Sequence, residues 1–547
     1  MPHPPRLPVR ARVFLLLAVL VCLLPGAGSI TRAGGPGVEL QFLNISDWHA
    51  QLDPIAVTGV GSVGGAAVLS AYWQADRAAN PNTLTLTAGD AFGASPPLSG
   101  LFNEEPAVLA MNLMGIQADT LGNHNFDRGV AHLQQMINLA SFPFLSANLK
   151  NVEDNLNGVA PYRIFDVGGV KVGVVGITNP EAASLVFPGN LGTMEVTDPV
   201  PAANKARARA QAEGAKVMVA LVHMGVTSID PATGAAAGPL IDFANNVGGF
   251  NLIFGDHTNF QFSAIINNAL VVENVSRGQT YARVKLTVDP GNGRVMDRRV
   301  EFVQPVVATV TPDPAIAQLL APYRAALAAA FDAVIGVATD LFPRGSNIER
   351  LREVAIGNLV TDAMRLRYGT QLAITNGGGL RAPLPSSYLP MDHTLRRTTA
   401  GYAVGPPFDL VVGDAYSVLP FGNVVITRSV TGAQLYAALE HSVAILPGAN
   451  GRFLQISGFR FVLDSSRAPG SRIVSVTLND GTPVLPDGST YTMALNDFTN
   501  AGGDGYAMFV DGQGVSRELL ADIVVQYIQA LGTITPVIEG RITDIKP

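Results

Sequence analysis

The chain has 547 residues, more than one domain usually holds, so we expect at least two domains. Its 36 Lys and Arg residues face 43 Asp and Glu residues, and the net charge of −7 argues against a broad electrostatic grip on a nucleic-acid polymer. Cys22 is the only cysteine, which excludes an intramolecular disulfide and leaves the fold to its core and to any bound metal ions.

The first 33 residues have the layout of a secretory signal. Arg6, Arg10 and Arg12 precede an apolar stretch at residues 13–24, and small residues follow it. The stretch is shorter than the roughly 20 residues that span a bilayer. We therefore expect cleavage after residues 1–33 without a membrane anchor, and a mature protein in the periplasm of a bacterium or in the medium.

Residues 36–305 are predicted to form a layered α/β domain, because strand-like runs alternate with helical stretches. The clearest helical stretches are residues 64–78, 103–115 and 198–214. Residues 262–302 differ, since short strands separated by Gly and Asn turns indicate an antiparallel closing layer.

Residues 306–335 are predicted to link this domain to a second one. Their Ala-rich part, residues 314–335, has the composition of an exposed connecting helix. The second domain, residues 336–547, has the α+β pattern. Its predicted helices lie near residues 353–368, 432–444 and 517–531.

Six apolar runs of the first domain each end in polar residues. Runs of about four to eight apolar residues between polar breaks indicate buried strands, and chemistry in open α/β sheets gathers at the carboxyl ends of such strands. One run, residues 171–178, ends in Asn179 and adds no evident ligand. The polar residues after the other five are Asp47 and His49; Asp90; Asn123, His124 and Asp127; His223; and His257 and Asn259.

This set of carboxylates, imidazoles and amides predicts a site for two divalent metal ions. Asp90 stands alone after its strand and suits the bridge between them. The remaining assignments are Asp47, His49 and Asn259 for one ion, and Asn123, His223 and His257 for the other. Mixed ligands of this kind suit Zn²⁺ or Mn²⁺ better than Ca²⁺. Such ions lower the pKa of a bound water to about 7 and supply a nucleophile at neutral pH.

His124 is not needed as a ligand. It is predicted to stabilise charge on the leaving oxygen or to protonate it, with Asp127 orienting the imidazole. The chain has eight histidines. Apart from His3 in the signal, the other three that follow no strand run, His132, His393 and His441, are interpreted as structural.

Taken together, the motifs DWHAQ, GDAFG, GNHNFDRG, LVHMG and GDHTN resemble those of the calcineurin-like metallophosphoesterases. More narrowly, they resemble the bacterial periplasmic 5′-nucleotidase/UDP-sugar hydrolase family. The resemblance implies a four-layer β-sandwich flanked by helices, the seven metal ligands assigned above, and His124 with Asp127 as the catalytic pair. The last motif departs from the relatives' Gly-His-x-His or Gly-His-x-Gln, because Asn259 takes the final place and Asp256 precedes the histidine. Asp256 is expected either to accept a hydrogen bond behind the ligands or to face solvent.

The second domain carries a candidate phosphate and base site. The Gly-rich loop at residues 376–381 allows backbone to approach a ligand and ends in Arg381, whose guanidinium matches phosphate geometry. Arg350 and Arg352 precede a helix in the same domain. Phe421 and Phe498 stand beside turns, where a pair of aromatic rings would sandwich a nucleobase, at about 1–3 kcal/mol per base.

These segments resemble the family's C-terminal nucleotidase domain, with its NGGGxR loop, PFG and the aromatic residue before GGDGY. The resemblance implies that Arg350, Asn376 and Arg381, with Gly378 in the loop, hold phosphate. It also implies that Phe421 and Phe498 clamp the base and that Asp504 accepts from the ribose hydroxyls, while Arg352 is left open. The relatives' closure motion implies that this domain delivers the phosphate to the metals, with residues 314–335 near the hinge.

The sequence thus predicts an exported, monomeric enzyme that cleaves 5′-nucleotides to nucleoside and phosphate with the help of two divalent ions. UDP-sugars, dinucleotides, 2′,3′-cyclic nucleotides or a sulfur compound are the alternative substrates on the same scaffold. A catalytically silent nucleotide-binding surface protein is the alternative outside enzymes.

Overall fold

Two β-sheets form the centre of the N-terminal domain in the computed structural model, which describes residues 37–57, 59–230 and 232–546. The predicted signal, residues 1–33, lies outside the described residues. One sheet has the strand order β19-β18-β1-β4 and the other β16-β17-β15-β12-β10-β9. The strands are β1 (Val38–Ile45), β4 (Thr83–Thr87), β18 (Tyr281–Val288) and β19 (Val295–Val303) in the first sheet, and β9 (Tyr162–Val167), β10 (Val170–Ile177), β12 (Val217–Val222), β15 (Leu252–Phe254), β16 (Phe262–Ile266) and β17 (Ala269–Glu273) in the second.

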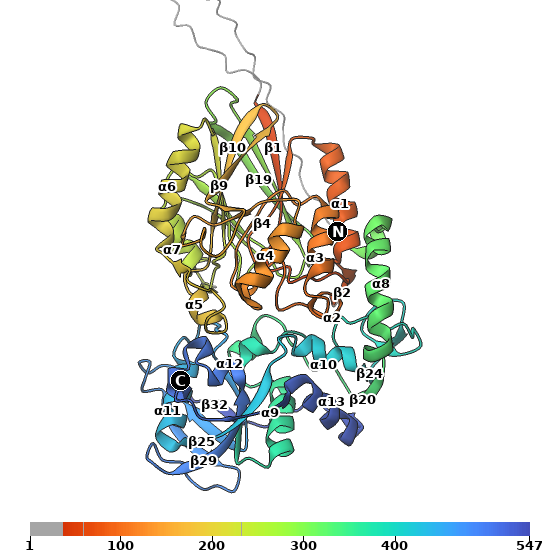
Figure 1. Ribbon diagram of the computed structural model, residues 1–547, viewed down its shortest axis with the longest axis vertical. Helices are drawn as coiled ribbons and strands as arrows, with labels where there is room; N and C mark the ends of the chain where they lie inside the picture. Colours follow the sequence, from red (N-terminus) through yellow and green to blue (C-terminus); the bar gives the residue numbers. More distant parts are fainter. Residues whose placement is uncertain (1–36, 58, 231, 547) are drawn as a thin grey trace, which may run out of the picture. The chain divides into compact units, whose positions relative to one another are not determined.

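The sheets and their helices make four layers, as the α/β prediction requires. Val172 and Val174 of β10 share a buried cluster with Phe42 of the opposite sheet, whereas Val175 faces the other way into a cluster with helical residues. This alternation follows from the two-residue period of a strand. The flanking helices are α1 (Ala66–Ala79), α3 (Glu105–Met114) and α4 (Gly129–Leu139) beside the first sheet, and α6 (Pro199–Ala212) and α7 (Pro239–Asn246) beside the second (Figure 1).

Parallel pairing places the carboxyl ends of the strands at common edges. β1 pairs in parallel with β4, and β10, β12, β15 and β17 pair in parallel in turn. Five of the six apolar runs are confirmed as buried strands, and the sixth forms only the two-residue strand β5 (Asp119–Thr120). The polar clusters therefore leave neighbouring strands on the same side.

The prediction of a single antiparallel closing layer at residues 262–302 is wrong. β16 and β17 belong to the six-stranded sheet, while β18 and β19 belong to the four-stranded one. β17 moreover pairs in parallel with β15, so its carboxyl end joins the edge that carries the polar clusters. The connection from β17 to β18 passes from one sheet to the other.

The helix predicted as an exposed connector is partly buried. α8 (Pro314–Phe331) packs against α1 and α3, and its Ile316, Leu320 and Leu327 lie within the same core cluster as these helices. Asp313 caps its first turn by accepting a hydrogen bond from the backbone of Ala315. Among the described residues, no helix is long and apolar enough to cross a membrane.

The C-terminal domain is built on a five-stranded sheet of order β26-β21-β29-β25-β30. Its strands are β21 (Leu372–Asn376), β25 (Val424–Thr431), β26 (Leu454–Ser457), β29 (Thr490–Asn496) and β30 (Val515–Leu519). The three predicted helices are present as α9 (Ala355–Tyr368), α11 (Gly432–Val443) and α13 (Leu520–Leu531), and α10 (Val412–Val418) packs on α13. Smaller sheets are made by β20 (Val334–Ala338) with β24 (Phe408–Val411) and β31 (Thr533–Ile534), and by β27 (Phe459–Leu463) with β28 (Ile473–Leu478) and β32 (Ile542–Asp544).

A buried ion pair fixes the segment that follows the Gly-rich loop. Arg397 makes two hydrogen bonds of 2.6 and 2.7 Å to the carboxylate of Asp414, and the same carboxylate accepts from the backbone and hydroxyl of Ser386. Removing one member of such a pair leaves the other charge buried and unpaired in the interior. The pair thereby ties residues 381–388 to α10.

Candidate functional site

Five of the seven predicted metal ligands lie on left-handed backbone. Their φ angles are 39° at Asp47, 48° at His49, 46° at Asp90, 85° at His257 and 64° at Asn259. Non-glycine residues in this region cost of order 1–3 kcal/mol each and persist only where the surroundings over-determine them. Their concentration at the strand ends marks this region as a functional site.

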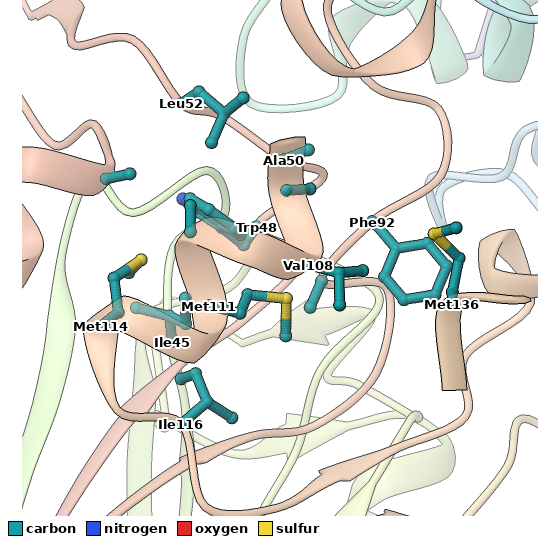
Figure 2. Packing of buried hydrophobic residues seen from close by; sticks show 14 of the residues in the cluster. Ile45, Trp48, Ala50, Leu52, Phe92, Val108, Met111, Met114, Ile116 and Met136 are labelled. Atoms are coloured by element: carbon teal, nitrogen blue, oxygen red, sulfur yellow. The ribbon is translucent and has the colours of Figure 1, made fainter. Parts of the chain in front are cut away.

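Buried aromatic side chains hold two of these strained turns. Trp48, between Asp47 and His49, is fully buried, and Phe92 follows Asp90 with 1% exposure. Figure 2 shows both in the cluster that contains Val108 and Met111 of α3. The two turns are also joined directly, because the backbone amide of His49 donates to the carbonyl of Asp90 at 2.9 Å.

The His and Asp members of the predicted ligand set converge. Ligand atoms of Asp47, His49 and Asp90 lie within 4.8 Å of one another, and so do those of Asp90, His223 and His257. Asp90 is common to both groups, as the predicted bridge requires, and the two groups match the predicted division of ligands between two ions. Which of these atoms bind metal stays a prediction.

Hydrogen bonds show which ring atoms face the cluster. Nδ1 of His49 lies 2.9 Å from the carbonyl of Gly93, and Nδ1 of His223 lies 3.0 Å from that of Ala88. A carbonyl only accepts, so both Nδ1 atoms carry a proton, and Nε2 is the atom of each ring that could bind a metal. Burial lowers the pKa of His49 and of His257 well below the usual value, which keeps both rings in the neutral form that a metal requires.

Several nitrogen and oxygen atoms of the predicted ligands meet at short distances. Nε2 of His223 lies 2.9 Å from Oδ2 of Asp90 and 3.3 Å from Nδ1 of His257. Oδ2 of Asp90 and Oδ1 of Asn123 are buried without a hydrogen-bond partner. Converging lone pairs in a dry interior are stabilised by cations, so the residues present fit a divalent metal.

The remaining ligand candidates line the two cavities at this site. Asn259 lines a small cavity of about 20 Å³ together with Asp47, His49, Asp90 and His257. Asn123 instead lines the neighbouring cavity of about 720 Å³. Asn179, which ends the run at residues 171–178, is buried at the wall of the larger cavity.

His124 and Asp127 form the expected pair. Nδ1 of His124 lies 3.0 Å from both carboxylate oxygens of Asp127, and its backbone amide donates to Oδ1 of Asp90 at 2.8 Å. The ring stands edge-on to His49 at 5.2 Å between centroids. Nε2 of His124 is thereby left for the cavity, at the margin of the ligand cluster.

Arg381 of the C-terminal domain reaches the ligand cluster. Its Nη2 lies 2.9 Å from Nε2 of His49, and both residues line the small cavity. Arg350 lines both cavities, and its nearest acidic neighbour is Glu349 at 3.5 Å. The exposed Arg352 lines neither cavity.

The Gly-rich loop owes its glycines to a neighbouring segment. The amides of Gly377 and Gly378 donate to the carbonyls of Phe453 and Gly451, and a Cβ at Gly378 would lie 3.1 Å from Cα of Gly451. A Cβ at Gly377 would lie 2.2 Å from the backbone oxygen of Glu349, so the close approach of Glu349 and Gly451 favours glycine at these two positions. Gly378 still lines the large cavity, although its amide is already used.

Asn376 and Asp504 are joined at the wall of the large cavity. Nδ2 of Asn376 donates to Oδ2 of Asp504 at 2.7 Å, and Nε2 of His441 lies 2.8 Å from the Asp504 carbonyl. His441, interpreted as structural from the sequence, thus supports the backbone of a predicted ribose-binding residue.

Phe421 and Phe498 also line the large cavity, and both are half-buried. Phe421 stacks on His124 with centroids 5.5 Å apart and an interplanar angle of 22°. A Cβ at Gly503 would meet the ring of Phe498 at 2.4 Å, which shows that this ring packs on the backbone of the Asp504 loop. Neither ring belongs to a core cluster, as expected for residues that contact a ligand.

The sequence interpretation missed Arg277 and Arg344, which line the small cavity. Arg277 donates to Oε1 of Gln51 at 3.0 Å and to the Arg381 carbonyl at 2.8 Å. It lies just beyond β17, whose apolar run ALVVE also breaks into polar residues. This change from apolar to polar residues is the sequence signal for Arg277. The prediction of a separate layer at residues 262–302 did not use it.

Comparison with known proteins agrees with these observations. The family described as "5'-nucleotidase, C-terminal domain" matches residues 334–511. The crystal structure of a 5′-nucleotidase precursor from Thermus thermophilus superposes with a TM-score of 0.82 and 29% identity, over 93% of this chain and 100% of that one.

Two further similar proteins illustrate how the relatives differ in name and in length. Snake venom 5′-nucleotidase of Naja atra is 28% identical over 92% of this chain and 98% of its own length. Endonuclease YhcR of Bacillus subtilis is 28% identical over 84% of this chain, which spans 37% of YhcR. The chain likewise spans 66% and 35% of two other bacterial relatives.

A four-layer sandwich with a strand-end ligand cluster, followed by an α+β domain, defines a two-domain protein of the calcineurin-like metallophosphoesterase class. Within that class, residues 334–511 match the 5′-nucleotidase C-terminal domain, and the chain as a whole is similar to 5′-nucleotidases.

The packing around Asp90 predicts that Gly122→Ala is destabilising. The added Cβ would lie 2.1 Å from Oδ1 of Asp90, so either the carboxylate or the backbone must move. We expect the free energy of unfolding to fall by about 1–3 kcal/mol. Urea denaturation followed by tryptophan fluorescence measures this, since Trp48 and Trp73 are both buried in the N-terminal domain. Gly248→Ala is the control, because nothing lies within 4 Å of its Cβ position. Equal stabilities of the two variants would contradict the prediction.

Proposed function

We propose that this protein is an exported, metal-dependent phosphohydrolase that cleaves 5′-nucleotides to nucleoside and phosphate. The observation that carries the proposal is the contact between Arg381 of the C-terminal domain and His49 of the ligand cluster, at 2.9 Å. A phosphoryl group bound by this guanidinium lies beside the proposed metal centre. The match of residues 334–511 to the 5′-nucleotidase C-terminal domain supports the reaction class, and relatives with the names snake venom 5′-nucleotidase and cell wall protein support a location outside the cytoplasm.

The proposed metal centre uses the ligands predicted from the sequence, with Asp90 between two ions. When bound, such ions polarise the phosphoryl oxygens and lower the pKa of water, which provides a nucleophile at neutral pH. Zn²⁺ and Mn²⁺ suit the mixed imidazole, carboxylate and amide donors.

The other proposed roles follow from the positions of the side chains. Arg381 and Arg350 orient the phosphoryl group, because a guanidinium offers parallel donors to its oxygens. His124 stabilises or protonates the departing oxygen through Nε2, while Asp127 holds Nδ1 and fixes the ring. Phe421 and Phe498 contact the base, and Asp504 accepts from the ribose hydroxyls. The large cavity, of about 720 Å³, is ample for a nucleotide.

Other phosphate esters, including UDP-sugars, dinucleotides and 2′,3′-cyclic nucleotides, are the second candidate class of substrate. A sulfur compound would use the same metals and arginines but not the aromatic rings. The half-buried Phe421 and Phe498 at the cavity wall favour a nucleotide.

The direct test of the proposal is phosphate release by the purified protein. Nucleoside 5′-monophosphates are expected to be hydrolysed, and a chelator is expected to abolish the activity because the ligand cluster needs cations. Restoring Mn²⁺ or Zn²⁺ should return the activity. A panel of phosphate esters assayed in parallel identifies the preferred substrate, and the absence of phosphate release from every ester with every divalent ion would refute the proposal.

His124→Ala is expected to lower kcat by about 10²–10⁴-fold, the usual contribution of a positioned acid or base. The metal content should stay that of the wild type, because His124 is not among the proposed ligands. His393→Ala is the matched control, since that ring stacks on Tyr402 at 4.5 Å and lines neither cavity. Steady-state kinetics and metal analysis check both points. An unchanged kcat in His124→Ala would remove His124 from the mechanism.

The double variant Phe421→Ala/Phe498→Ala is expected to raise KM for a nucleoside monophosphate by tenfold or more, since stacking contributes about 1–3 kcal/mol per base. Glycerol 3-phosphate, an ester without a base, serves as the control substrate. Because Phe421 also stacks on His124, any effect on catalysis itself shows with both substrates, whereas loss of base recognition shows only with the nucleotide. Equal changes for the two substrates would favour a non-nucleotide substrate.

A further inference from the structure

We propose that Asp256 strengthens metal binding by His223, by placing a carboxylate behind the imidazole ring on the side away from the proposed ions. Asp256 is therefore a positioning residue of the metal centre rather than one of its ligands. The inference rests on the metal centre of the proposed function and is independent of the choice of substrate.

The first observation is the burial of a carboxylate oxygen without a partner. Asp256 has 0% exposure, so the alternative in which it faces solvent is wrong. Its Oδ1 accepts from the backbone amide of His257 at 2.9 Å, while Oδ2 has no hydrogen-bond partner among the described residues. An unsatisfied buried acceptor costs about 1–3 kcal/mol, and more when it is charged. The oxygen therefore needs a compensating positive charge nearby.

The second observation is the direction in which this oxygen lies. Oδ2 of Asp256 is 3.8 Å from Nδ1 of His223, whereas Nε2 of the same ring is 2.9 Å from Asp90. The two aspartates thus approach the ring from its opposite nitrogens. Asp90 is on the side of the ligand cluster, and Asp256 is on the side of the protonated Nδ1.

These positions determine how Asp256 acts. Nδ1 of His223 donates to the Ala88 carbonyl at 3.0 Å, so Nε2 is the ring atom that could bind a cation. A negative charge close to Nδ1 polarises the ring and makes Nε2 a stronger donor to a metal. Partners of this kind typically change metal affinity by 10–100-fold.

Asp256 also adds charge to a cluster that already holds two carboxylates. Asp47, His223 and Asp256 have ligand-type atoms within 4.8 Å of one another. A divalent cation would be attracted by each of these carboxylates. Both effects of Asp256, on His223 and on the cation, favour the metal-bound form.

The test is metal binding by Asp256→Asn, measured without any nucleotide. Asparagine keeps an acceptor for the His257 amide and removes the charge, so the local backbone is preserved. The protein is freed of metal with a chelator and titrated with Mn²⁺ in a calorimeter, and bound metal is counted by mass spectrometry. We expect the affinity for one ion to fall by about 10–100-fold. Asp256→Gly, which removes both the charge and the acceptor, should show at least the same loss.

Thermal unfolding separates this role from a merely structural one. Metal-free Asp256→Asn should unfold at a temperature no lower than the wild type, because no charge remains to be buried. Its gain in Tm on adding Mn²⁺ should be smaller, because weaker binding stabilises less. A structural role would instead lower the metal-free Tm. Asp198→Asn is the matched control, since this exposed aspartate also accepts a backbone amide, from Val200, and should behave as the wild type.

The outcomes separate a failure of the role proposed for Asp256 from a failure of the proposed metal centre. If the wild type binds two ions and Asp256→Asn binds them with unchanged affinity, the role of Asp256 is overturned while the proposed function stands. If the wild type binds neither Mn²⁺ nor Zn²⁺, the metal centre fails and the inference fails with it.

Discussion

The candidate site depends on one constraint, which is the left-handed backbone at the ends of neighbouring parallel strands. A residue that leaves a strand in this conformation turns at once, so its side chain points across the sheet edge toward the next strand's turn. Asp47, His49 and Asp90 are all held in this way. The strain is offset by burial of Trp48 and by the hydrogen bond from His49 to the Asp90 carbonyl. Folding energy of the sandwich thus sets the positions of the ligand atoms.

Much of this was predictable because the signals are local. A strand, its carboxyl end and the polar residue that follows occupy fewer than ten consecutive residues, and parallel pairing makes neighbouring ends converge without further information. Helices such as α1, α9 and α13 were predictable for the same reason. The apolar periodicity that indicates a helix, and the Gly and Pro residues that indicate its ends, all lie within one element. The pairing of His124 with Asp127 lies within a single turn and was equally accessible.

The features that the sequence did not predict depend on contacts between distant segments. β17 joins the second sheet through parallel pairing with β15, and only this pairing brings Arg277 to the cluster. Gly377 and Gly378 of the 376–381 loop lie against Glu349 and Gly451, which no local pattern connects to them. The buried face of α8 exists only because α1 and α3 are there to cover it. In each case the missing information was the identity of a packing partner.

The charges at the small cavity explain why the two domains meet at this point. Two aspartates, Asp47 and Asp90, share it with four arginines, namely Arg277, Arg344, Arg350 and Arg381. The aspartates suffice to attract cations, but the arginines would repel a metal-loaded cluster at the short distances seen here. A phosphoryl dianion between the arginines and the metal-loaded cluster would attract both of them. The proposed substrate would therefore stabilise the arrangement that brings Arg381 to His49, and an uncharged ligand of the same shape would not.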